Sequence, residues 1–137
     1  MLSAARGNMA LAKSALFNTV PEEDYLQLFP KGHIDGKKVV DFLKYKKADV
    51  AAATNVPEST IRYEPQKMPI ELKERLTEWA IALNLVQGFF KDEAKTILWL
   101  SIPNPLLGGM SPRDMIRVGR FKKLLNFIQT ALDENQR

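Results

Sequence analysis

The stretch WLSIPNPLLGGMSPRDMIRVGR, residues 99–120, constrains the fold more than any other part of the chain. An apolar helical run ends in it at Ile102. Pro103 and Pro105 then stop the helix, because proline lacks a backbone N–H and clashes with the preceding turn. Between them stands Asn104, a residue that turns the chain by bonding its own backbone. The sequence therefore predicts a helix end followed by a tight turn.

The second half of this stretch predicts a new helix. Gly108 and Gly109 allow the backbone a positive φ without steric cost. Ser111 suits the N-cap, Pro112 the first helical position, and Asp114 places an acid in the first turn. A loop this apolar must be packed on something, and the simplest interpretation is an ordinary buried corner between two helices.

This segment resembles the toxin-binding domain of bacterial Xre/MbcA/ParS-type antitoxins. The resemblance covers roughly residues 90–135, and the positions that match the family pattern are Trp99, Leu100, Pro103, Asn104, Leu107, Gly108, Gly109 and Pro112. It implies a small helical antitoxin that masks an NAD-consuming toxin with a RES domain. The residues expected to bind the toxin are Trp99, Leu100, Asn104, Leu107, Gly108, Gly109, Arg113, Arg117 and Arg120.

Composition argues against several classes of chemistry. The 137 residues include no cysteine, which excludes disulfides, thiolate metal sites and a cysteine nucleophile. The one histidine, His33, lies between glycines in a loop, which favours a solvated residue over a metal ligand or a base. The chain has no Walker loop, dinucleotide fingerprint, HExxH or GxSxG motif. We therefore expect no enzyme, no cofactor and no metal site.

Charge and hydropathy bear on partners and location. The net charge of +4 permits nucleic-acid binding without requiring it. No apolar run approaches the ~20 residues that a membrane span needs. The N-terminal MLSAARGNMALAKSALF is basic and lacks acids, which fits a transit peptide, an amphipathic helix or a frayed leader. Lys13 interrupts its apolar stretch, so a secretory signal fits poorly. We expect a cytoplasmic protein with no membrane partner.

Apolar residues recur at helical spacing along the chain, and no sustained alternation indicates a strand, so the sequence predicts an all-α fold. Residues 1–36 form a leader, partly helical or flexible, with a short helix from Pro21 through Leu28. A linker with two prolines, residues 64–69, then separates a segment at 37–66 from a helical domain at 67–137.

The helical domain contains three predicted helices besides the one that Ser111 caps. A long helix covers 70–90, with its apolar residues at three- and four-residue steps. Asp92 caps the next helix, which runs through Leu100. The last helix begins near Gly119 and carries a clean apolar stripe.

The segment before the linker has the spacing of a helix-turn-helix. A first apolar helix carries Val39, Val40, Phe42 and Leu43. An alanine-rich helix at 47–54 follows it, and a third short helix covers 57–63. Asn55 between them tolerates the left-handed turn conformation, and Val56 and Ile61 point inward. Such a motif places its second helix in the major groove of DNA. A helical corner with no DNA function is the alternative.

The exposed positions of this segment are the candidates for DNA contact. Lys46 and Lys47 suit backbone phosphates, and Arg62 suits a guanine edge or a phosphate. Glu58 and Glu64 repel the same phosphates. The expected DNA-binding residues are Lys46, Lys47, Ser59, Thr60, Arg62 and Tyr63. The resemblance strengthens this expectation, because these antitoxins often carry a DNA-reading segment before the toxin-binding part.

Both halves together predict an antitoxin of a type II toxin–antitoxin pair. It would cover the active site of its RES-domain toxin and repress its own operon by binding operator DNA, as a homodimer or a toxin–antitoxin hetero-oligomer. The alternative is a DNA-binding transcriptional regulator with a C-terminal helical oligomerisation domain. The basic run from Arg113 to Lys123 stays open as a solvated face or as a surface for an acidic partner or the DNA backbone.

Overall fold

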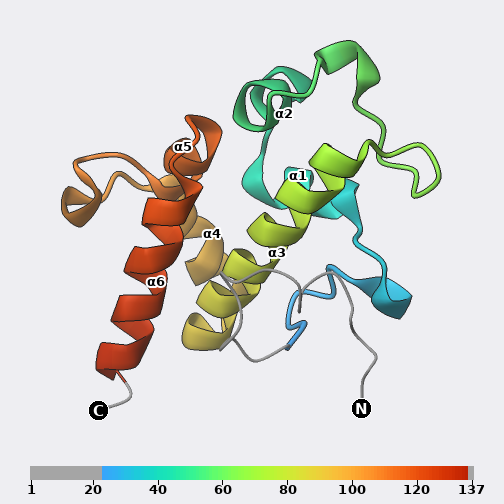
Figure 1. Ribbon diagram of the computed structural model, residues 1–137. Helices are drawn as coiled ribbons and strands as arrows, with labels where there is room; N and C mark the ends of the chain where they lie inside the picture. Colours follow the sequence, from blue (N-terminus) through green and yellow to red (C-terminus); the bar gives the residue numbers. More distant parts are fainter. Residues whose placement is uncertain (1–22, 136–137) are drawn as a thin grey trace.

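The computed structural model describes residues 23–135 (Figure 1). Within them lie six α-helices, three short 3-10 turns and no strand, so the predicted all-α fold is confirmed. The α-helices are α1 (Gly36–Leu43), α2 (Lys47–Thr54), α3 (Ile70–Phe90), α4 (Glu93–Ser101), α5 (Pro112–Arg117) and α6 (Phe121–Asn135). The 3-10 turns are η3 (Pro30–Gly32), η4 (Glu58–Thr60) and η5 (Pro105–Leu107).

The long helix α3 is the centre of the core. It packs against α1, α2, α4 and α6, and Figure 1 shows it running between the N-terminal helices and α6. Trp79 near its middle is fully buried and meets the ring of Tyr45 edge-on, with 5.8 Å between the ring centroids. Buried residues from Val39 on α1 to Ile128 on α6 belong to one hydrophobic cluster. The segments on the two sides of the predicted linker therefore share a single core.

Short-range side-chain caps fix several helix starts. Asp92 accepts a hydrogen bond from the Lys95 backbone N–H at 3.1 Å at the start of α4. Ser111 accepts one from the Asp114 N–H at 3.2 Å at the start of α5. Both caps were predicted from the sequence and both are confirmed. The bounds of α3 also match the predicted 70–90, because its ends are set by Pro69 before it and the left-handed Lys91 after it.

The predicted leader falls largely outside the described residues. Of the helix predicted from Pro21 through Leu28, residues 23–28 form an irregular turn instead, with Gln27 in the left-handed region at φ 55°. The reason is Asp24, whose carboxylate accepts hydrogen bonds from the Leu28 and Phe29 N–H groups at 2.8 and 2.9 Å. Asn84 on α3 donates to the same carboxylate at 3.0 Å, which fixes this segment against α3.

The predicted helix-turn-helix is only half present. The first helix is α2, and Asn55 after it is left-handed with φ 62°, as predicted. The prediction of a second helix over 57–63 is wrong, because only the η4 turn forms and Ile61 beyond it is extended. Arg62 explains the difference, since its guanidinium donates to the Ser59 carbonyl at 3.0 Å, the acceptor that a continuing helix would use. Pro65 also disfavours helical geometry in the residue before it.

Candidate functional site

The turn from Pro103 to Met110 is held by its own hydrogen bonds. The side chain of Asn104 accepts from the Leu106 N–H at 2.9 Å, the turning role that the sequence predicted. Its backbone N–H donates to the Met110 carbonyl at 3.0 Å, and its carbonyl accepts from Gly109 at 3.0 Å. Gly108 and Gly109 have φ of 72° and 86°, as expected of glycines in such a turn. The turn is therefore fixed by its own hydrogen bonds, together with the packing of Leu107 and Met110 against the core.

This turn and α4 display apolar side chains to solvent. Leu98, Ile102 and Leu106 are 58%, 46% and 77% exposed. We call these three residues the apolar face. The expectation that the apolar loop is packed on something holds for Leu107, which lies against the core, but within the described residues nothing covers Leu106. Leu98 lies on α4, Ile102 directly after it and Leu106 in η5. Exposed apolar groups that form a patch mark interaction surfaces in soluble proteins.

Two of the predicted toxin-binding residues face the core instead. Leu100 is 3% exposed and is therefore not accessible to a partner, which corrects the prediction for it. Trp99 is partly buried and packs against the same core. Leu98 and Ile102 were not among the predicted toxin-binding residues, although their four-residue spacing is typical of one side of a helix. The helix has two apolar sides, and the pattern alone does not tell which of them the fold covers.

Arg113 is engaged within the fold. Its Nε donates to the Leu43 carbonyl at 2.8 Å and its Nη2 to the Lys44 carbonyl at 3.0 Å, at the end of α1. Its guanidinium lies 5.5 Å from the centroid of the Tyr45 ring, and the Tyr45 hydroxyl donates to the Arg113 carbonyl. Burial raises the pKa of Tyr45, which keeps this hydroxyl a donor. We call this set the Arg113 clasp. Arg113 therefore has a role inside the fold, and its contact with a partner stays a prediction.

The other predicted arginines lie nearer to the surface. Arg117 pairs with Asp114, with 3.1 Å between Nη2 and the carboxylate oxygen. Arg120 is exposed, and its Nη1 lies 3.8 Å from the sulfur of Met110 at the end of the turn. Lys122 and Lys123 on α6 are exposed as well. Of these basic residues, Arg120 is the one in contact with the end of the apolar turn.

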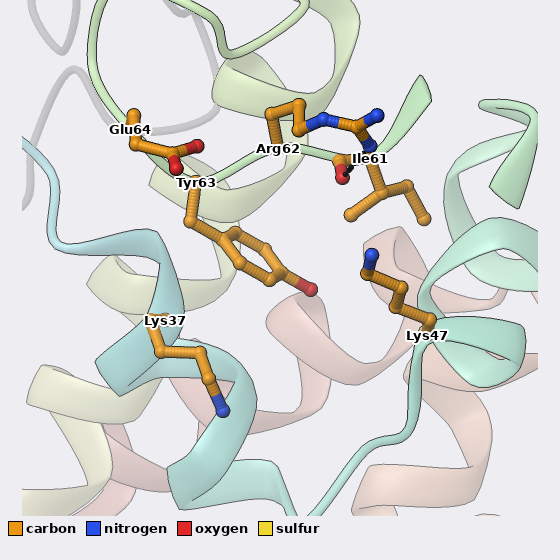
Figure 2. A pocket seen from close by; sticks show the side chains of 6 residues that line it. All are labelled: Lys37, Lys47, Ile61, Arg62, Tyr63 and Glu64. Atoms are coloured by element: carbon orange, nitrogen blue, oxygen red, sulfur yellow. Dashed lines mark hydrogen bonds between the residues drawn. The ribbon is translucent and has the colours of Figure 1, made fainter. Parts of the chain in front are cut away.

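The predicted DNA-binding residues divide into two groups. Lys47, Arg62 and Tyr63 line one open pocket of about 410 Å³, whereas Lys46, Ser59 and Thr60 are exposed outside it. The full lining, drawn in Figure 2, is Lys37, Lys47, Ile61, Arg62, Tyr63 and Glu64. Lys37 on α1 was not among the predicted residues, because only the fold brings it beside residues 61–64.

The side chains of Arg62 and Thr60 donate hydrogen bonds to backbone carbonyls around η4. Both hydrogen bonds of the Arg62 guanidinium leave from Nη1, to the carbonyls of Ser59 and Ile61. The Thr60 hydroxyl donates to the Pro57 carbonyl at 2.8 Å. These groups hold an extended segment where the sequence predicted a helix. Any contact with DNA would therefore come from this segment and the start of α2.

The remaining chemistry of the described residues is limited. His33 is exposed in its loop. Within residues 23–135, no group of three or more histidine, cysteine or acidic side chains lies close enough to hold a metal ion. None of the helices in this part of the chain is long and apolar enough to cross a membrane.

Comparison with known proteins adds no assignment. The chain matches no protein-family model, and no curated protein matches it.

Proposed function

We propose that this protein is an antitoxin that neutralises an NAD-consuming RES-domain toxin by covering its active site. The observation that carries the proposal is the apolar face. Leu106 at its tip is the most exposed large apolar residue of the described chain, 77% accessible, on a turn fixed by hydrogen bonds. The resemblance of residues 90–135 to antitoxin toxin-binding domains supports the same assignment.

The shape of this surface suits a tight protein contact. A turn that is already ordered loses little conformational entropy on binding, which leaves more of the burial energy for affinity. Leu98, Ile102 and Leu106 would form the apolar centre of the contact, and Arg120 beside them would stand at its rim. Interfaces of this kind concentrate their binding energy in a few central residues, with arginine prominent among them. The matching toxin surface would be an apolar cleft bordered by acidic groups.

Repression of the operon by operator binding is the second part of the proposal. It is supported by Lys47, Arg62 and Tyr63, which the fold places around one pocket. Because no recognition helix follows α2, base contacts would come from the η4 turn and the extended residues after it. The antitoxin would act on DNA as a homodimer or together with its toxin.

The alternative function is a DNA-binding transcriptional regulator whose C-terminal helices join two copies of the chain. The apolar face favours this candidate too, because two copies can bury it against each other. The candidates differ in what occupies the face. Sedimentation of the protein alone would show a dimer that Leu106→Asp dissociates if the face is an oligomerisation surface. A regulator of this kind would give no protection against a RES-domain toxin.

Co-expression with the cognate RES-domain toxin tests the antitoxin proposal. Wild-type protein should preserve cellular NAD and growth. Leu106→Asp should abolish this protection, because it buries an unpaired carboxylate in the contact. Ile70→Asp is the matched control, since Ile70 is 69% exposed at the start of α3, a helix that contributes no residue to the apolar face. Full protection by Leu106→Asp would show that the apolar face does not bind the toxin.

A further inference from the structure

The pocket beside α2 has a composition that its structural role does not explain. Lys37, Lys47 and Arg62 bring three cations to its lining, and Glu64 brings one carboxylate. Lys37 is already paired with Asp41, with 2.6 Å between the ammonium and the carboxylate oxygen. Asp41 neutralises Lys37, and Glu64 offsets one of the two charges of Lys47 and Arg62. The pocket therefore keeps about one positive charge. A group with one negative charge matches this arrangement.

Tyr63 supplies the second observation. Its hydroxyl oxygen is enclosed, and no hydrogen-bond partner for it exists within the described residues. Figure 2 shows the hydroxyl pointing into the pocket, toward the side from which the Lys47 ammonium also points inward. Burial raises the pKa of Tyr63, with the Asp41 carboxylate acting in the same direction, so the hydroxyl keeps its proton. A buried donor without an acceptor is costly, and a bound acceptor would remove that cost.

The donors that remain in the pocket specify the ligand. Tyr63 offers one O–H, and Lys47 offers an ammonium with no ion-pair partner within the described residues. Arg62 uses only Nη1 for its backbone contacts, so Nε and Nη2 stay open to a ligand. Several donors around one excess positive charge suit an oxyanion with one negative charge and several acceptor oxygens. Of the groups found on biological polymers, a phosphodiester has both properties.

We propose that this pocket binds one phosphodiester of a nucleic-acid backbone, through the Lys47 ammonium and the Tyr63 hydroxyl, which a small rotation of the Tyr63 side chain would bring to the open side of the pocket. The inference rests on the operator-binding part of the proposed function and refines it. The contact would be independent of sequence, because a phosphate carries no base information. It would position the η4 turn on the duplex, so that promoter preference would come from other residues.

The proposal is tested by measuring the binding of a random-sequence DNA duplex by fluorescence anisotropy at low salt. Tyr63→Phe should weaken duplex binding by about tenfold, since it deletes one hydrogen bond to a charged group. Lys47→Ala should weaken it at least as much and reduce the salt dependence of log K by ~1. The matched controls are Tyr25→Phe and Lys95→Ala, which alter the same groups outside the pocket and should change affinity by less than about twofold. Thermal unfolding of each variant verifies that it is folded.

The outcomes separate this proposal from operator recognition. Weaker duplex binding by both pocket variants supports the site, whether or not the wild-type protein prefers its promoter. Preference for the promoter with Tyr63→Phe binding as tightly as wild type would overturn the site and leave operator recognition standing. Binding of inorganic phosphate without binding of the duplex would also overturn it, because the occupant would then be a free anion.

Discussion

At the scale of single residues, the Tyr63 hydroxyl has a cost that can be measured without any ligand. An enclosed hydroxyl with no partner loses its hydrogen bonds to water on folding and gains none in return. Tyr63→Phe should therefore raise the free energy of unfolding by about 1 kcal/mol. Urea denaturation measures this change, with Tyr25→Phe as the exposed control. A loss of stability would show that the hydroxyl is hydrogen-bonded in the free protein.

Two arginines of the basic run should contribute very differently to the free energy of unfolding. Arg113→Ala removes two hydrogen bonds to backbone carbonyls and the contact with the Tyr45 ring, so it should lower the free energy of unfolding by about 2 kcal/mol. Arg120→Ala removes an exposed side chain and should change it by less than about 0.5 kcal/mol. Thermal or urea unfolding of both variants checks the contrast. Equal losses would mean that Arg120 also supports the fold.

Arg120 has a further test in the complex. If it stands at the rim of the toxin contact and is covered there, Arg120→Ala should weaken toxin binding by about 2 kcal/mol at unchanged thermal stability. Calorimetric titration of the toxin measures this difference. A variant that folds and binds fully would place Arg120 on a solvated face.

At the scale of helices, Glu78 on α3 gives stability a dependence on pH. Burial raises the pKa of Glu78 above the ordinary value of 4.5, although Arg75 beside it acts in the opposite direction. The folded protein therefore holds this proton more tightly than the unfolded chain, and stability falls as pH rises from about 4.5 through the folded pKa. Glu78→Gln removes this loss.

Urea denaturation at several pH values isolates the effect. The stability of Glu78→Gln relative to wild type should increase as pH rises through that window and then stay level. Glu74→Gln on the same helix is the exposed control, because the Glu74 side chain is 62% accessible. A relative stability that is independent of pH would contradict the assignment to Glu78.

Helix ends show which parts of the fold the sequence can predict. Asp92 and Ser111 cap helices through bonds to backbone groups three residues away, and such short-range patterns are visible in the sequence. The helix predicted at 57–63 does not form. The Arg62 side chain competes with the helical backbone N–H for the Ser59 carbonyl, and the spacing of apolar residues does not reveal this competition.

The candidate surfaces were predictable only in part. The Asn104 turn and its glycines were recognised, because turn chemistry is local. Leu98 and Leu100 look alike in the sequence, and only the packing of α4 buries one and exposes the other. The bonds from Arg113 to Leu43 and Lys44 join residues about seventy positions apart, so no local pattern indicates them.

At the scale of the whole molecule, one core implies one unfolding transition. Buried residues on both sides of the predicted linker belong to the same cluster, and α1 and α6 both pack on α3. Far- and near-ultraviolet circular dichroism should therefore give coincident thermal curves. A fragment of residues 67–137 should lack a cooperative transition, because the side of α3 that α1 covers would be exposed to water. Two separate transitions in the full chain would contradict the single core.

The Arg113 clasp also fixes the geometry between the two candidate surfaces. The Tyr45 hydroxyl, just before α2, donates to the Arg113 carbonyl at the start of α5. The Arg113 guanidinium in turn donates to the carbonyls of Leu43 and Lys44 at the end of α1. A flexible tether would let the separation of two bound partners vary with its length. Here one core and the Arg113 clasp join the two surfaces, so their separation and mutual orientation would vary little. Copies bound side by side along a duplex would therefore present their apolar faces in the same direction only at multiples of the helical repeat of about 10.5 base pairs, and half a repeat would turn the next copy to the opposite side.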